Sequence, residues 1–185
     1  MGMTAPAIYR YFPSLEALVR ALAEDLMEEV AGVVAAASEA AGDDPGRQLA
    51  AMARAYRAWA VGHPVEFGLV FGAPVPGVGH LGLECLPDDP GADLGRPYLE
   101  AFLRLWQRRP WPTPPREYML EHLGPHLGPL REAHGDLPIE VAYTFLSGWA
   151  RLYGMVAMEV FQQLRWALTD PEALFEAEIV QFLSQ

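Results

Sequence analysis

The histidines near the middle of the chain are the side chains whose spacing comes closest to a metal site. His122 and His126 are four residues apart, and Glu121 stands beside the first of them. On one unbroken helix, two histidines at that spacing would share a face and could bind zinc. Gly124 and Pro125 separate them, and this dipeptide disfavours an unbroken helix. We therefore expect no metal site.

Serine and cysteine offer no catalytic arrangement either. Each serine fits a simple capping or packing role, and no set of nucleophile, base and orienting group can be assembled. No glycine-rich phosphate loop lies between a strand and a helix. The single Cys85 excludes an intramolecular disulfide and a thiolate-rich metal site. The sequence thus predicts a protein that is not an enzyme and that carries no cofactor.

Aromatic side chains are the remaining candidates for binding chemistry. They could line a cavity for an apolar ligand, with tyrosine hydroxyls and His63 as orienting groups, or they could fill an ordinary core. The residues by themselves leave both interpretations open. The aromatic residues in question are Tyr56, Trp59, Phe67, Phe71, Tyr98, Phe102, Trp106, Tyr143 and Trp149.

These residues fall on segments with helical spacing. The chain has 185 residues, of which 51% are hydrophobic, and this length suits one domain, or one large domain with a small appendage. We find no convincing strand, so the expected fold class is all-α. Apolar periodicity and capping signals predict a loop at 72–95 and helices at 14–37, 45–62, 64–71, 94–109, 118–134 with interruptions, 138–168 as the longest, and 171–183.

The start of the chain predicts a short helix, a tight stop and a second helix. Thr4 can cap the short helix, Pro13 ends it, and Ser14 can cap the next one. The exposed face of the short helix would carry small and hydroxyl-bearing residues with one cation, Arg10. Such residues near a helix N-terminus suit entry into the major groove of DNA.

Charge confines any DNA contact to this end of the chain. The net charge is −11, and all thirteen basic residues are arginine, so the chain is a poor general binder of nucleic acid. Within residues 1–20, Arg10 and Arg20 outnumber the single acid Glu16. The nearly uncharged stretch 141–158 carries Arg151 at its middle, which favours a buried helix over a membrane span. No signal-peptide pattern is found, and we expect a cytoplasmic protein.

Three segments resemble a known family. Residues 4–18, Thr-Ala-Pro-Ala-Ile-Tyr-Arg-Tyr-Phe-Pro-Ser-Leu-Glu-Ala-Leu, are similar to the recognition helix and following helix of TetR-family (tetracycline-repressor-like) transcriptional regulators. Residues 63–77 and 149–161 resemble that family's ligand-binding domain, whose penultimate helix carries a Trp-His-Gly pattern. Here the middle residue of the pattern is Tyr153, which puts any role of an imidazole in doubt.

The resemblance implies a TetR-like helical bundle with a truncated N-terminal helix-turn-helix. Residues 1–24 would be a remnant of the DNA-binding domain, and residues 25–185 a ligand-binding and dimerisation domain. The implied DNA-binding residues are Thr4, Ala5, Pro6, Tyr9 and Arg10. The implied ligand-binding residues are His63, Phe67, Phe71, Tyr98, Phe102, Trp106, Tyr143, Trp149 and Tyr153.

Residues 141–161 carry one bulky and one small-residue stripe at helical spacing. Two apolar faces on one helix need two partners. A homodimer would provide the second partner, whereas a monomer would have to bury this helix completely. The resemblance favours the homodimer, with an interface formed by Ser147, Ala150, Gly154, Ala157, Phe161, Phe175, Ile179 and Phe182.

The function implied by the resemblance is that of a ligand-responsive transcriptional repressor. It would bind operator DNA as a homodimer and be released by a small apolar effector. The cavity would be bounded by residues 64–71, residues 98–106 and the long helix, with residues 72–95 as its lid.

The chain also departs from the family, whose members have two helices before the recognition helix. Only three residues precede it here. We expect upstream codons to encode about 30–40 further residues with the missing half of the helix-turn-helix. Without them, the chain should dimerise but bind DNA weakly or not at all. The alternative function is a dimeric ligand-binding protein that no longer binds DNA because its helix-turn-helix is incomplete.

Overall fold

The structure is a computed structural model that describes residues 11–73, 90–128, 130, 134 and 137–184. Every regular element among them is helical, and they contain no β-strand, which confirms the all-α class. The residues expected to contact DNA, together with most of the expected lid, lie outside the described residues. None of the helices searched within the described part has the length and apolar character to span a membrane.

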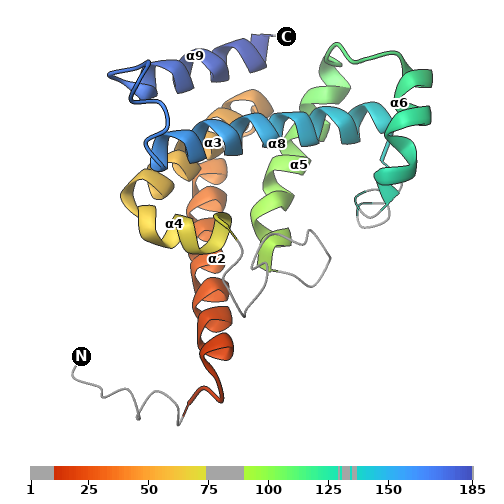
Figure 1. Cartoon of the computed structure of the whole chain (residues 1–185). Helices are drawn as coiled ribbons and strands as arrows, with labels where there is room; N and C mark the ends of the chain where they lie inside the picture. Colours follow the sequence, from red (N-terminus) through yellow and green to blue (C-terminus); the bar gives the residue numbers. More distant parts are fainter. Residues whose placement is uncertain (1–10, 74–89, 129, 131–133, 135–136, 185) are drawn as a thin grey trace.

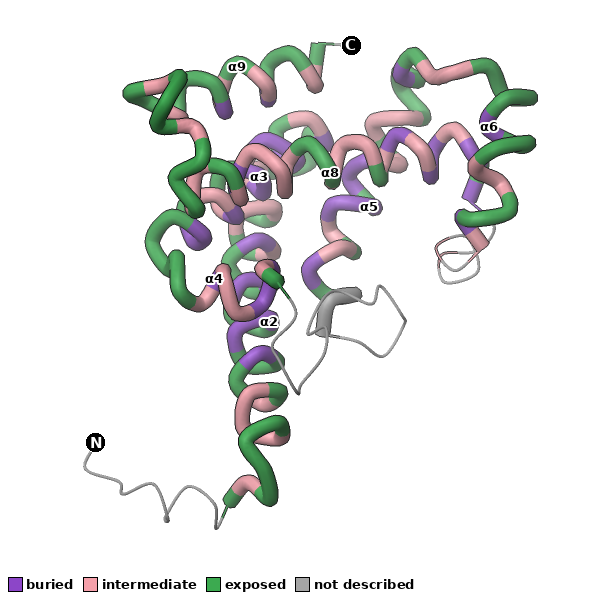
Figure 2. The backbone as a smooth tube through the Cα atoms, viewed as in Figure 1, coloured by how far each residue is buried: buried purple, intermediate pink, exposed green. Residues whose placement is uncertain are grey.

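The longest described helix is α2, Leu15–Ala40. It begins where the sequence predicts, because the Ser14 hydroxyl accepts a hydrogen bond from the Ala17 amide at 3.1 Å. One face of the helix, from Ala23 to Val34, packs into the body of the molecule, whereas its N-terminal end projects away from that body (Figures 1 and 2). The proposed domain boundary at 24/25 therefore falls inside one continuous helix.

Helices α3 and α4 also begin at predicted residues. In α3, Pro45–Gly62, the Asp44 carboxylate caps the first turn by accepting from the Arg47 amide at 2.9 Å. Helix α4, Pro64–Phe71, is the expected short apolar helix. Helix α5, Pro90–Arg108, starts earlier than expected, since a proline is compatible with a first helical turn. The predicted loop at 72–95 is therefore too long at its C-terminal end.

Two elements that follow α5 form a smaller core. Helix α6, Arg116–His122, ends before the 3-10 turn η1, Gly124–His126, so the expected interruption between the two histidines is confirmed. Side chains from this region pack against the start of helix α8, Ile139–Val160. The buried residues of this second cluster are Met119, Leu127, Ile139 and Ala142.

The expected helix at 138–168 is wrong at its C-terminal end. Helix α8 stops at Val160 because Gln162 adopts a left-handed backbone conformation with φ of 58°. The Gln162 amide donates to the Glu159 carbonyl at 2.9 Å, and the Gln163 amide donates to the Met158 carbonyl at 2.7 Å. This pair of bonds is a Schellman motif, which normally carries glycine at the left-handed position.

Helix α9, Pro171–Ser184, closes the described fold. The Asp170 carboxylate accepts from the Glu172 amide at 3.0 Å, as the Asp-Pro pair predicts. Buried side chains from α2, α3, α4, α5, α8 and α9 form one continuous main core. Helix α2 packs on α3, α4 and α5, so the first described helix contacts the elements that surround the candidate site.

Candidate functional site

An apolar cavity lies between α3, α5, α8 and α9. It has a free volume of about 90 Å³ within a wider hollow of about 690 Å³ that opens to solvent. Drug-sized ligands occupy pockets of roughly 300–1,000 Å³, so such a ligand needs the wall to move. The residues that line it are Leu49, Ala50, Ala53, Tyr98, Phe102, Phe145, Gly148, Trp149, Arg151, Leu152, Met155, Glu178, Ile179, Phe182 and Leu183.

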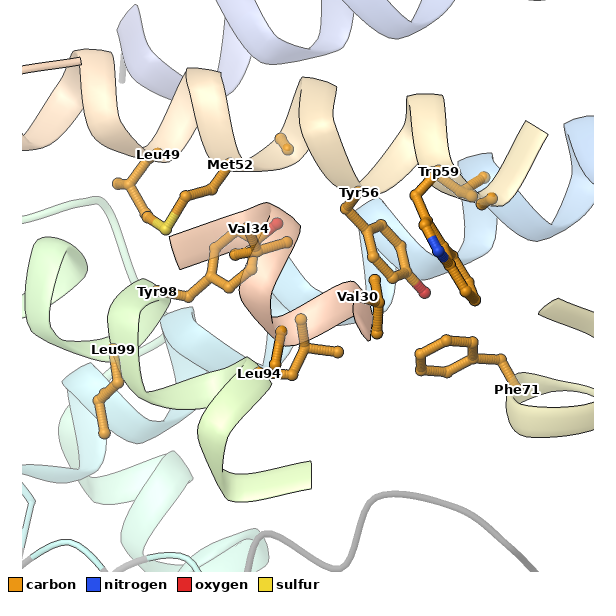
Figure 3. Close-up of a cluster of buried hydrophobic side chains, with 14 of the residues drawn as sticks. Val30, Val34, Leu49, Met52, Tyr56, Trp59, Phe71, Leu94, Tyr98 and Leu99 are labelled. Atoms are coloured by element: carbon orange, nitrogen blue, oxygen red, sulfur yellow. The ribbon is translucent and has the colours of Figure 1, made fainter. Parts of the chain in front are cut away.

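Aromatic rings continue from the cavity wall into the core. The Trp149 ring centroid lies 6.1 Å from that of Tyr98 and 5.7 Å from that of Tyr56. The Tyr56 ring meets Phe71 edge-on at 5.6 Å. Figure 3 shows Tyr56 from α3, Tyr98 from α5 and Phe71 from α4 in one buried cluster. The predicted aromatic residues therefore serve both as a cavity wall and as ordinary core.

Two hydroxyl groups in this cluster lack hydrogen-bond partners among the described residues. They belong to Tyr56, which is fully buried, and Tyr98, which is 6% exposed. Burial raises the pKa of both phenols, well above the usual range for Tyr98, so both stay neutral at physiological pH. An unsatisfied buried hydroxyl costs free energy on the order of 1–3 kcal/mol.

Tyr153, which stands where the family pattern has histidine, makes a different contact. Its hydroxyl donates to the Phe71 carbonyl at 2.6 Å, and its ring stacks on Phe67 at 6.3 Å. The side chain thus ties α8 to the C-terminal end of α4. That end directly precedes the segment expected to form the lid.

The structure brings some of the predicted ligand-binding residues together and leaves others apart. Tyr98, Phe102 and Trp149 line the cavity. Phe67, Phe71, Trp106 and Tyr153 pack in or against the main core next to it. His63 is exposed at the α3–α4 junction, where its ring stacks on Trp59 at 5.4 Å, and Tyr143 packs against the second cluster.

Several cavity residues were not predicted. Small and aliphatic side chains of α3 and α8 complete the wall, for example Ala53 and Leu152, and α9 adds Ile179. Such residues look the same in a core and in a ligand site, so the sequence has no signal that separates them. The sequence indicates Tyr56 only as an aromatic residue that could line a cavity. That its hydroxyl lacks a partner among the described residues follows only from the packed structure.

Ion pairs attach α9 to the rest of the bundle at its N-terminal end. The Arg57 guanidinium donates to both carboxylate oxygens of Glu159 at 2.7 and 2.6 Å. It lies 3.3 Å from Glu172 and 5.3 Å from the Phe175 ring centroid. Arg54 likewise binds Glu176 through two hydrogen bonds. These contacts hold the first half of α9 on α3, next to the part of α9 that lines the cavity.

The C-terminal end of α9 is held by its backbone carbonyls. The Trp111 indole donates to the Phe182 carbonyl at 3.0 Å, and Arg109 donates to the Leu183 carbonyl. The Phe182 ring lies close to Gly148, since a Cβ at that glycine would be 3.1 Å from it. The ring therefore stands at the cavity between α8 and α9.

The predicted dimer residues differ in their exposure. Phe175 and Ile179 are buried inside the protomer, which leaves Leu174 and Val180 as the large apolar side chains that α9 exposes. On α8 and its end, Ala150 and Phe161 are exposed. The partly buried residues of the predicted set are Ser147, Gly154, Ala157 and Phe182.

Comparisons with known proteins agree on one family. The model of the tetracyclin repressor-like C-terminal domain matches residues 49–182. The HTH-type transcriptional regulators Rv1816 of Mycobacterium tuberculosis and Mb1846 of Mycobacterium bovis are each 30% identical to this chain, over 96% of it and 76% of their own length. The solved structure of the regulatory protein SCO4313 matches with a TM-score of 0.74 and 30% identity, over 100% of this chain and 81% of that one.

Proposed function

Because this chain belongs to the TetR (tetracycline-repressor-like) family of transcriptional regulators and is not an enzyme, we propose that it represses transcription as a homodimer. In this proposal the dimer binds operator DNA, and a small apolar effector releases it. The observation that carries the proposal is the apolar cavity between α3, α5, α8 and α9. Two of its four walls, α3 and α5, pack directly on α2.

A ligand in the cavity can act at a distance because α2 joins the two ends of the molecule. Its buried face packs on α3 and α5, which are cavity walls, and its N-terminal end leads to residues 4–10. Trp59 of α3 adds a polar link, since its indole donates to the Glu29 carboxylate at 2.8 Å. A shift of α3 would move α2 with it. In a dimer, this changes the spacing of two recognition helices that must match half-sites roughly 34 Å apart.

The DNA contacts of this proposal come from the first residues of the chain. Thr4, Ala5, Pro6, Tyr9 and Arg10 would face the major groove. Their hydroxyls and single cation are suited to base edges and phosphates. Because the net charge of −11 opposes long-range attraction to DNA, sequence-specific contacts have to supply the affinity. Regulation of transcription would place the protein in the cytoplasm.

Exposed apolar side chains on α8 and α9 support the homodimer. Leu146 and Met158 on α8 are 38% and 39% exposed, and Val180 on α9 is 64% exposed. Gly154 has no atom within 4 Å of the place where its Cβ would be. A second copy could therefore approach α8 closely. Isologous pairing of identical helices is the commonest way to cover such a surface.

A mobility-shift assay on the promoter of the protein's own gene tests the proposal. A form of the protein with a complete helix-turn-helix should retard that DNA, and a compound from a hydrophobic library that raises the melting temperature should abolish the retardation by linkage. Compounds that stabilise the protein although it never retards DNA would favour the alternative, a dimeric ligand-binding protein without operator binding. Retardation that no stabilising compound alters would contradict the role of the effector.

A further inference from the structure

The inner wall of the cavity meets the two tyrosines whose hydroxyls have no partner in the described part of the chain. Tyr98 and Trp149 both line the cavity. The Trp149 ring contacts the Tyr98 ring on one side and the Tyr56 ring on the other. Both hydroxyl oxygens are closed off from the cavity in this structure, and a movement of this indole would open the cavity toward them. Two neutral hydrogen-bonding groups thus lie behind the wall of an otherwise apolar space.

Charge in the cavity wall restricts what can bind there. Among the described residues that line it, the ionisable side chains other than Tyr98 are Arg151 on α8 and Glu178 on α9, which have opposite charges. Arg151 is exposed and Glu178 is partly exposed, so both can stay hydrated at the opening. The only polar side chains that are buried in the described part of the chain, apart from the tyrosines, are Gln48 and Thr144. An ionic ligand would lose its hydration there without gaining a buried counter-ion.

We propose that the effector is an uncharged, mainly apolar molecule with a carbonyl or hydroxyl oxygen, and that the Tyr98 hydroxyl binds this oxygen with help from Tyr56. The identification of this ligand as the effector rests on the proposed function, but its binding does not. The ligand satisfies hydroxyls that burial leaves unpaired, and this is where its selectivity arises. Because the free volume is only about 90 Å³, Trp149 or Phe182 moves when the ligand enters.

Binding of Nile red, a neutral dye that fluoresces in apolar surroundings, gives a direct measurement on the full chain. Three competitors share one ring system: 2-acetylnaphthalene, 2-isopropylnaphthalene and 2-naphthoate. The ketone should displace the dye at about one-tenth the concentration that the hydrocarbon needs, as expected for one hydrogen bond to a previously unpaired group. The carboxylate should be the weakest competitor. Equal competition by ketone and hydrocarbon, or stronger competition by the carboxylate, would overturn the proposal.

Tyrosine variants assign the hydrogen bond. Tyr98→Phe should make the ketone and the hydrocarbon equal competitors, and Tyr56→Phe should reduce the preference in part. In the ligand-free protein both substitutions should raise the melting temperature by about 2–4 °C, because each removes an unsatisfied hydroxyl. Tyr153→Phe is the matched control and should lower the melting temperature, since it removes the bond to the Phe71 carbonyl. A lower melting temperature for Tyr98→Phe would mean that its hydroxyl already has a partner, and would refute the proposal.

Two glycine variants locate the site. Gly148→Val should abolish Nile red binding, because Gly148 lines the cavity and a Cβ there meets the Phe182 ring. Gly32→Val, on the exposed face of α2 with open space at its Cβ, should leave binding within about twofold. Binding that survives Gly148→Val places the ligand elsewhere. If the dye binds as expected but no competitor alters the mobility shift, the proposed function fails while this site stands. If compounds alter the mobility shift but the dye and its competitors do not behave as expected, the site is rejected while the proposed function stands.

Discussion

At the scale of single residues, an arginine on another helix sets the pKa of the Glu176 carboxylate. Arg54 donates to its two oxygens at 2.7 and 2.6 Å, and this lowers the pKa of Glu176 below its ordinary value of 4.5. A carboxyl group whose pKa is lowered on folding stabilises the native state above that ordinary value. The contribution is lost as the pH falls through the lowered pKa.

We therefore expect Glu176→Gln to make the free energy of unfolding less dependent on pH from about pH 5 downward. The loss at pH 7 should stay below about 1 kcal/mol, because the Arg54 and Glu176 side chains are 50% and 39% exposed. Urea unfolding at several pH values measures both effects. Glu117→Gln is the control, since Glu117 is exposed and makes no ion pair with the described residues. If the free energy of unfolding of Glu176→Gln depends on pH as steeply as that of the unchanged protein, the ion pair makes no pH-dependent contribution to stability in solution.

At the scale of elements, helix starts and one helix end follow from local chemistry, whereas the end of α8 does not. Ser14 and Asp44 cap α2 and α3 through their own side chains. Helix α2 ends before Gly42, whose φ of 75° suits glycine. Helix α8 ends with the same kind of left-handed residue, but here it is Gln162. A glutamine gives no stop signal, which is why the sequence predicts a helix that runs on to residue 168.

Gln162→Gly should stabilise the protein by about 1 kcal/mol, because glycine adopts a left-handed conformation without steric cost. If the helix instead continued through this position, the same change would destabilise it by about 1 kcal/mol. The sign of the shift in melting temperature therefore distinguishes the two structures. Gln163→Gly, one residue later, serves as the comparison and should not stabilise.

At the scale of the whole molecule, the described residues leave a partly apolar surface exposed. It is formed by α8 and α9, where Leu146, Met158 and Val180 are exposed. Because Phe175 and Ile179 are buried inside the protomer, only the opposite side of α9 can contact a second copy. The proposed homodimer would cover this surface, and the cavity between α8 and α9 would then lie next to the subunit interface.

Ala150→Arg should convert the proposed dimer into a monomer, because a buried interface would have to accommodate an unpaired guanidinium. Ala150 is exposed in the protomer, so the fold itself should tolerate the change. Sedimentation velocity measures the oligomeric state, and circular dichroism checks the helix content. Ala36→Arg, on the exposed face of α2, should remain dimeric. A variant at position 150 that sediments like the unchanged protein would place the interface elsewhere or exclude it.

The sequence by itself determined the all-helical class, most helix starts and the TetR family, because these depend on short-range signals. Caps such as Ser14 and Asp44 act within one helical turn. The break between His122 and His126 depends on the adjacent Gly-Pro pair. The site residues Thr4, Ala5, Pro6, Tyr9 and Arg10 were inferred in the same local way, and they remain predictions.

Only the tertiary structure decided which apolar residues face a cavity and which face a core. Tyr98 and Tyr143 look alike in the sequence, yet the first lines the cavity and the second packs against the small cluster near α6. The unpaired hydroxyls of Tyr56 and Tyr98 likewise appear only once helices distant in the chain have packed. Helical periodicity identifies the buried face of a helix, but the partner that covers each position depends on contacts between distant segments, which no local pattern records.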